Sequence, residues 1–98
     1  MNVKKTIEAS KMEIALDGKF DAISAPQFEA EIKNDLDRIT ELYIDMSAVE
    51  YISSAGLRTL LFLQQTMEEK GRMVVRNVPE VVSSVFEVTG FDEIITIE

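Results

Sequence analysis

The sequence predicts an α/β fold in which helices pack on a mixed, mostly parallel sheet of four or five strands, in the order β-β-α-β-α-β-α-β. Two observations predict this class. Early in the chain, apolar residues recur at every second position, which is typical of a strand with one buried face. Later, short apolar runs are separated by segments with apolar residues at helical spacing, and strands separated by helices pair in parallel through right-handed crossovers. The length of 98 residues fits one domain over 1–98.

The first two strands are expected to form an antiparallel hairpin. Met12, Ile14 and Leu16 occupy alternate positions, so one face of this strand should be buried. Residues 3–8 alternate less regularly and would pair with it across a short turn. Gly18 is expected to mark the end of the second strand.

A helix is predicted next, because the spacing of apolar residues changes to four, four and three. The stripe consists of Phe28, Ile32, Leu36 and Ile39. Pro26 suits the first turn, where its missing N–H would have had no partner within the helix. Ser24 is the expected N-cap.

The remaining elements follow from short apolar runs, typical of strands buried on both faces, and from helical spacing closed by glycine. They are a strand over 42–46, a helix over 54–70 ended by Gly71, a strand over 73–75, a helix opened by Pro79 and ended by Gly90, and a strand over 94–97.

The composition excludes several kinds of active site and partner. The chain has no cysteine, histidine or tryptophan, so it lacks thiolate nucleophiles, disulfides and the histidine of a Ser-His-Asp triad. Eighteen acidic against ten basic residues give a net charge of −8, which disfavours nucleic acid and anionic membranes as partners. No apolar stretch resembles a signal peptide or a membrane span. We therefore expect a cytoplasmic protein with no cofactor.

The most informative stretch for function is residues 45–58, DMSAVEYISSAGLR. A buried strand is expected to end near Met46, and a helix should begin at Ser53 or Ser54 after a short connection. Functional groups of parallel sheets gather beyond the carboxyl ends of strands, where a helix N-terminus presents unpaired N–H groups and the positive end of its dipole. Capping is the simplest role for such serines, and one glycine without an adjacent lysine is no phosphate-binding loop.

Several segments resemble the STAS domain family of anti-sigma factor antagonists, whose central signature is a strand ending in Asp-Leu-Ser followed by Asp-Ser-Ser/Thr-Gly-Leu. The matching residues are Asp45-Met46-Ser47, Val49, Ile52 and Ser53-Ser54-Ala55-Gly56-Leu57. Residues 16–21 are similar to the family's Gly-x-Leu-Asp turn, and residues 77–79 and 88–92 to its closing helix. The resemblance covers nearly the whole chain.

The resemblance implies a function switched by phosphorylation, with the family's phosphorylated serine falling on Ser54. It implies that an ATP-dependent serine kinase, which is also the anti-sigma factor, modifies this serine, and that a metal-dependent phosphatase reverses the step. Only the unmodified form would bind the anti-sigma factor and free its sigma factor. Ser53 stands where the family has aspartate, so both serines remain candidates; the spacing to Gly56 favours Ser54.

The expected partner-binding surface gathers small residues and a few polar ones. It comprises Asp21, Ile23, Ser53, Ser54, Ala55, Gly56 and Arg58. Asp21 either caps the turn before the first helix or, as the resemblance implies, lies near the acceptor serine and assists binding. Asp45 either ties down its connection or lies near the same site. A third reading, Asp21 and Asp45 as an acid/base or metal pair, is less favoured because no third ligand is evident.

Three classes of function therefore stay open. The first is a binding module without catalytic activity, switched by phosphorylation of Ser54. The second, motivated by Ser53 in place of aspartate, is a STAS module that is never phosphorylated and senses a small anionic ligand or serves as an accessory subunit. The third is a small enzyme using carboxylates or serine, which the lack of histidine, cysteine and a lysine-activated serine makes the least favoured.

Overall fold

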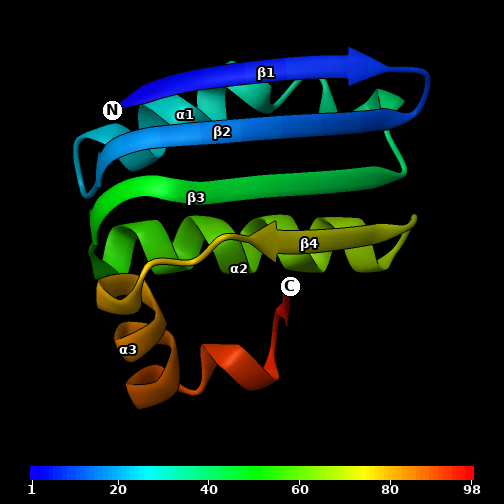
Figure 1. The fold of residues 1–98 in the computed structure, drawn as a ribbon. Helices are drawn as coiled ribbons and strands as arrows, with labels where there is room; N and C mark the ends of the chain where they lie inside the picture. Colours follow the sequence, from blue (N-terminus) through cyan, green and yellow to red (C-terminus); the bar gives the residue numbers. More distant parts are fainter.

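Five strands form one sheet in the order β1-β2-β3-β4-β5 (Figure 1), which confirms the predicted α/β class and the order of elements. A computed structural model describes all 98 residues. The strands are β1 (Asn2–Glu8), β2 (Lys11–Phe20), β3 (Glu41–Ile52), β4 (Arg72–Arg76) and β5 (Thr96–Ile97). β1 pairs with β2 in antiparallel fashion, and every later pair is parallel, as predicted.

The helices leave the front face of the sheet open in the view of Figure 1. They are α1 (Ser24–Ile32), α2 (Ser54–Glu68) and α3 (Glu80–Thr89), with 3-10 turns at Leu36–Arg38 and Phe91–Glu93. α1 and α2 cover the sheet, whereas α3 extends past the β4 edge at the end where the parallel strands finish. Residues that follow those strands therefore gather at one end of the molecule.

The predicted alternation places the core against the covered face. Met12, Ile14 and Leu16 of β2 are almost fully buried, while the residues between them are exposed. The rings of Phe20 and Phe28 meet edge to face, with centroids 5.6 Å apart, and join the end of β2 to α1. Such aromatic pairs add about 0.5–1.5 kcal/mol beyond burial alone, so this contact helps to fix α1 on the sheet.

The first helix is shorter than the apolar stripe predicted. α1 ends at Ile32, and a separate 3-10 turn begins at Leu36, although Leu36 and Ile39 are buried as expected. The break falls in the polar segment 33–35, where asparagine and aspartate favour turns over helix. The stripe therefore predicted the buried residues correctly and the continuous helix wrongly.

β2 and β3 are longer than predicted. Gly18 does not end β2 but lies within it at φ 114°, beside a shift in the register of its pairing with β3. β3 runs past Met46 to Ile52, which pairs with Phe20 at the end of β2. Such irregularities let two strands bend and stay hydrogen-bonded. The connection expected after Met46 is thus part of the strand.

Smaller differences concern the ends of later elements. α2 stops at Glu68, before Gly71, whose missing side chain serves instead for close packing, since a Cβ there would collide with the carbonyl of Thr40. Gly90 ends α3 in the left-handed conformation, as predicted. The last strand is reduced to Thr96–Ile97 because the N–H groups of Ile94 and Ile95 donate back to the carbonyl of Phe91, so both residues belong to the preceding turn.

Asp35 ties β1 to the segment after α1. Its buried carboxylate accepts hydrogen bonds from Lys5 Nζ at 2.7 Å and from Arg38 Nη2 at 2.6 Å. These bonds, that from Lys5 foremost, hold the pKa of Asp35 below its usual value. The ionised carboxylate is therefore part of the folded structure.

Replacing Asp35 with asparagine (D35N) is expected to lower the free energy of unfolding at neutral pH, because two cations lose their partner. Since the pKa is lower in the folded chain, the carboxylate's contribution is complete above its unfolded pKa of about 4 and is lost as the pH falls through the folded pKa. Urea unfolding at about pH 7 and about pH 2 measures the difference in free energy of unfolding between wild type and D35N. A difference between variant and wild type that stays the same at both pH values would contradict it.

Candidate functional site

The tip of α2 is organised by Ser53, which is its N-cap. Ser53 has extended backbone (φ −98°, ψ 176°), and its Oγ accepts a hydrogen bond from the Gly56 N–H at 3.4 Å. Its own N–H donates to the carbonyl of Phe20 at 2.9 Å, which fixes the helix start against the end of β2. The helix itself begins at Ser54, within the predicted limits.

The two neighbouring serines differ in their surroundings. Ser53 is half-buried and its hydroxyl group serves the cap, whereas Ser54 is exposed and takes no part in the cap. Ser54 stands in the first turn, where N–H groups lack partners within the helix and the helix dipole is positive. Its hydroxyl group is thus open to another molecule at a place that favours negative charge.

This difference predicts unequal effects of alanine on stability. Ser53→Ala is expected to lower the free energy of unfolding by about 1 kcal/mol, as the loss of a serine N-cap does. Ser54→Ala should change it by less than about 0.5 kcal/mol, as is usual at an exposed position. Urea unfolding of both variants measures the two values, and equal losses would contradict the assignment of the cap to Ser53.

Gly56 brings the first turn of α2 close to the sheet. It is buried, and a Cβ at this position would lie 2.8 Å from both Ile52 Cγ1 and the carbonyl oxygen of Phe20. No side chain fits there. Of the residues predicted for the partner surface, Gly56 therefore lies beneath it and sets the approach of α2 to β2.

Asp21, which follows Phe20, organises the turn before α1. Its Oδ1 accepts hydrogen bonds from the N–H groups of Ile23 and Ser24, both at 3.0 Å, and Ser24 Oγ accepts one from the Asp21 N–H at 2.9 Å. This is the reciprocal arrangement of a capping box. The prediction of Ser24 as the N-cap is wrong, because Ser24 is the first residue of α1. The preceding Ile23 makes no side-chain cap bond, and the Asp21 carboxylate accepts the N–H bonds instead. The bond from the Ser24 N–H is the main cause that lowers the pKa of Asp21.

A groove of about 400 Å³ separates the beginnings of α1 and α2. Small side chains predominate along it, with Glu29 and Arg58 as its charged members. The lining residues are Ala22, Ala25, Pro26, Glu29, Ala55, Arg58 and Thr59. Beside it, Ile23 is 74% exposed and lines a second hollow with Asp21 and Glu50. We call the surface formed by Asp21, Ile23, Ser54, Ala55 and Arg58 the tip surface.

Sequence reasoning missed Tyr51 as a surface residue. Its ring is 49% exposed at the end of β3, two residues before the N-cap. Its position in the sequence could have indicated this, because Tyr51 is an aromatic residue two positions before the serine pair. Half-exposed tyrosine is enriched at protein interfaces because it combines a large apolar area with a polar tip.

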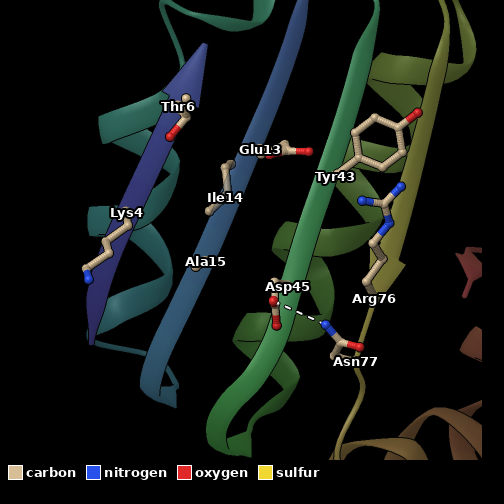
Figure 2. Close-up of a pocket in the computed structure, with 9 residues that line it drawn as sticks. All are labelled: Lys4, Thr6, Glu13, Ile14, Ala15, Tyr43, Asp45, Arg76 and Asn77. Atoms are coloured by element: carbon tan, nitrogen blue, oxygen red, sulfur yellow. Dashed lines mark hydrogen bonds between the residues drawn. The ribbon is translucent and has the colours of Figure 1, made fainter. Parts of the chain in front are cut away.

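A separate hollow of about 370 Å³ lies on the open face of the sheet, between side chains of β1 and β4 (Figure 2). Its charged groups are largely paired within the chain. Arg76 lies 4.1 Å from the centroid of the Tyr43 ring and 3.3 Å from the carboxylate of Glu98. Asn77 Nδ2 donates to Asp45 Oδ2 at 3.2 Å, as Figure 2 shows. This hollow is part of a polar, internally bonded sheet face.

Asp45 ties down its own strand, one of the two roles considered for it. Its Oδ1 accepts a hydrogen bond from the Ser47 N–H at 2.8 Å, which is the main cause that lowers the pKa of Asp45. Asp21 and Asp45 line different hollows, so the structure does not bring this pair together. No group of three or more carboxylates is placed to hold a metal ion. None of the helices is both long and apolar enough to traverse a lipid bilayer.

Comparisons with known proteins identify the family of this chain. The family model described as the STAS domain matches residues 2–98. BtrV of Bordetella bronchiseptica, named as an anti-sigma factor antagonist, is 35% identical over 78 residues, which cover 78% of this chain and 67% of that protein.

Solved structures of anti-sigma factor antagonists share the fold. SpoIIAA in its unphosphorylated form superposes with a TM-score of 0.86 at 19% identity, over 99% of this chain and 88% of that one. An antagonist from Mycobacterium paratuberculosis superposes with a TM-score of 0.87 at 23% identity, over 98% of this chain and 83% of that one. Bacillus SpoIIAA in its phosphorylated form superposes with a TM-score of 0.78 at 18% identity, over 99% of this chain and 91% of that one. The family model spans nearly the whole chain, so the chain belongs to the STAS domain family.

Proposed function

We propose that this chain is an anti-sigma factor antagonist whose binding is switched at Ser54. Unmodified, it would hold an anti-sigma factor through the tip surface and so free a sigma factor; phosphorylated, it would release that partner. The observation that carries this proposal is the division of roles at α2, where Ser53 caps the helix and Ser54 stays exposed. The name of the 35% identical relative BtrV supports the same role.

A phosphate on Ser54 is compatible with the fold. It adds about −1.5 to −2 charges at neutral pH. At a helix N-terminus each negative charge gains about 0.3–1 kcal/mol from the dipole and the unpaired N–H groups. Arg58 is exposed four residues further along α2, on the same side of the helix, and offers a cation to the phosphate. The domain should therefore stay folded when it is modified.

The partner, in contrast, would meet this phosphate directly. The groove beside Ser54 is lined by small residues, so an apolar partner surface can approach the backbone of α2 closely. A phosphate there adds bulk and a charge that the interface must desolvate, at a cost of several kcal/mol. A loss of about 3 kcal/mol lowers affinity by about 100-fold. Release then needs no change of conformation.

The covalent step uses this chain as substrate and not as catalyst. The Ser54 oxygen forms a bond to the γ-phosphorus of ATP, the bond to ADP breaks, and the hydroxyl proton passes to the kinase's base. We propose that the kinase is the anti-sigma factor itself and that a metal-dependent phosphatase transfers the group to water, which restores the hydroxyl. Use of ATP by the partner favours the cytoplasm as the place of action.

Transfer of labelled phosphate tests this function. The chain is incubated with a serine-kinase anti-sigma factor from the same cells and ATP labelled at the γ-phosphate. Wild type and Ser53→Ala are expected to take up label, and Ser54→Ala is not. Label on Ser54→Ala but not on Ser53→Ala would assign the wrong serine. Absence of label on all three, with the partner still bound, would favour a STAS module that is never phosphorylated.

A further inference from the structure

α3 presents an apolar stripe that the chain itself covers only in part. Val81, Val85 and Val88 follow one another at spacings of four and three, so they lie along one side of the helix. Val81 is 50% exposed and Val88 is 88% exposed, while Val85 between them is half-buried and packs at the edge of the core. The core takes a different side of α3, with Val82 and Phe86 fully buried. We call Val81, Val85 and Val88 the α3 valine stripe.

Nothing within the fold accounts for valine at the exposed positions. Valine is a poorer helix former than alanine or the long polar residues, because its branched side chain is restricted against the preceding turn. Its usual compensation is burial, which Val88 lacks. A single exposed apolar residue is ordinary, but a row of them on one side of a helix is typical of a contact surface.

The charged residues of the chain segment that carries the stripe are all acidic. Residues 77–98 contain no lysine or arginine, and their acidic residues are Glu80, Glu87, Asp92, Glu93 and Glu98. Only Glu98 among them forms an ion pair within the chain, with Arg72 and Arg76. On α3, Glu80 and Glu87 each directly precede an exposed valine and are themselves exposed. Negative charge thus flanks the stripe and is free to meet a cationic partner.

We propose that the α3 valine stripe docks a basic amphipathic helix of a partner protein. From Val81 to Val88 the stripe is about 10 Å long, which matches two turns of a docked helix. Small valines let the two helices approach closely, and lysines or arginines beside the partner's apolar face would meet Glu80 and Glu87. No residue of the α3 valine stripe belongs to the tip surface, so the proposal goes beyond the switch and does not depend on phosphorylation of Ser54.

The acidic residues beside the stripe disfavour two other partners, a second copy of this chain and an anionic membrane. A second copy would set Glu80 and Glu87 against the same acidic residues. An anionic membrane would be repelled by a segment that has no basic residue at all. A basic helix is the partner for which both the apolar stripe and the acidic flanks are favourable.

Two matched peptides test the proposal on the whole ¹⁵N-labelled chain by NMR. One is an amphipathic helix with leucine at positions i, i+3, i+4 and i+7 and lysine at the flanking positions; the other has glutamate in place of each lysine. The basic peptide is expected to shift the amide signals of residues 80–89 saturably, and more weakly as salt is raised. The acidic peptide should leave them unchanged.

Variants separate the apolar from the electrostatic contribution. The double variant Val81→Ser/Val88→Ser is expected to bind the basic peptide about tenfold more weakly, or weaker still. The double variant Glu80→Gln/Glu87→Gln should bind it several-fold more weakly, and its affinity should depend less on salt. Phe62→Ser, at a 42% exposed position on α2, is the control and should bind as wild type. No shift with the basic peptide, equal binding of both peptides, shifts centred outside α3, or self-association through the stripe would overturn the proposal.

Discussion

Ser54→Asp is expected to weaken binding of the anti-sigma factor by about 100-fold, whereas Ser54→Ala should bind within about threefold of wild type. Aspartate places a negative charge at the exposed tip of α2, where the partner must desolvate it. Alanine removes a hydroxyl group that takes no part in the cap, so it leaves the helix start unchanged. Titration calorimetry with the purified partner measures both affinities.

A charge control distinguishes this local effect from general repulsion. Ser10→Asp adds the same charge in the β1–β2 turn, which lies at the far end of the sheet from the tip of α2 (Figure 1). It should bind as wild type. If Ser10→Asp weakened binding as much as Ser54→Asp, net charge would be responsible; if Ser54→Asp bound as tightly as Ser54→Ala, the switch would be refuted.

Gly56→Ala is expected to destabilise the domain by about 1–3 kcal/mol, although alanine normally stabilises a helix relative to glycine by about 1 kcal/mol. The reversal of sign comes from contact, because the added Cβ would lie 2.8 Å from the carbonyl oxygen of Phe20 and from Ile52 Cγ1. The backbone oxygen cannot move away without breaking its hydrogen bond to the Ser53 N–H. Urea unfolding measures the change.

The same substitution should also displace the tip surface. Pushing the first turn of α2 away from β2 moves Ser54 relative to Asp21 and Ile23, so we expect weaker partner binding even at temperatures where the variant is folded. Gln65→Ala is the control, because it places an alanine in the same helix at an exposed position outside the tip surface, and it should bind as wild type. A more stable Gly56→Ala variant would show that α2 does not pack closely on β2.

The sequence predicted best those features that depend on local periodicity. Met12, Ile14 and Leu16 alternate because one face of β2 is buried, and a two-residue period is visible without any knowledge of the partner strand. The end of α1 could not be predicted in this way. Asn34 and Asp35 favour a turn, but the apolar stripe continues past them, and the contact that holds Asp35 comes from Lys5, thirty residues earlier and outside any pattern within the helix.

The candidate site shows the same division. The position of the serine pair at a helix start followed from the small residues and glycine of 53–56. Which serine caps the helix depends on where β3 ends, and β3 extends to Ile52 through pairing with β2, far away in sequence. The same pairing places Tyr51 in β3, opposite Lys19, whereas a strand that ended at Met46 would have left it in a loop.

Mapping the phosphorylation site of this protein isolated from its own cells tests the switch most directly. Fragmentation between Ser53 and Ser54 in the mass spectrometer distinguishes the two serines. The structure leads us to expect a phosphoryl group on Ser54 in part of the protein, removable by a serine phosphatase. A phosphoryl group on Ser53 alone, or none under any growth condition, would contradict the assignment.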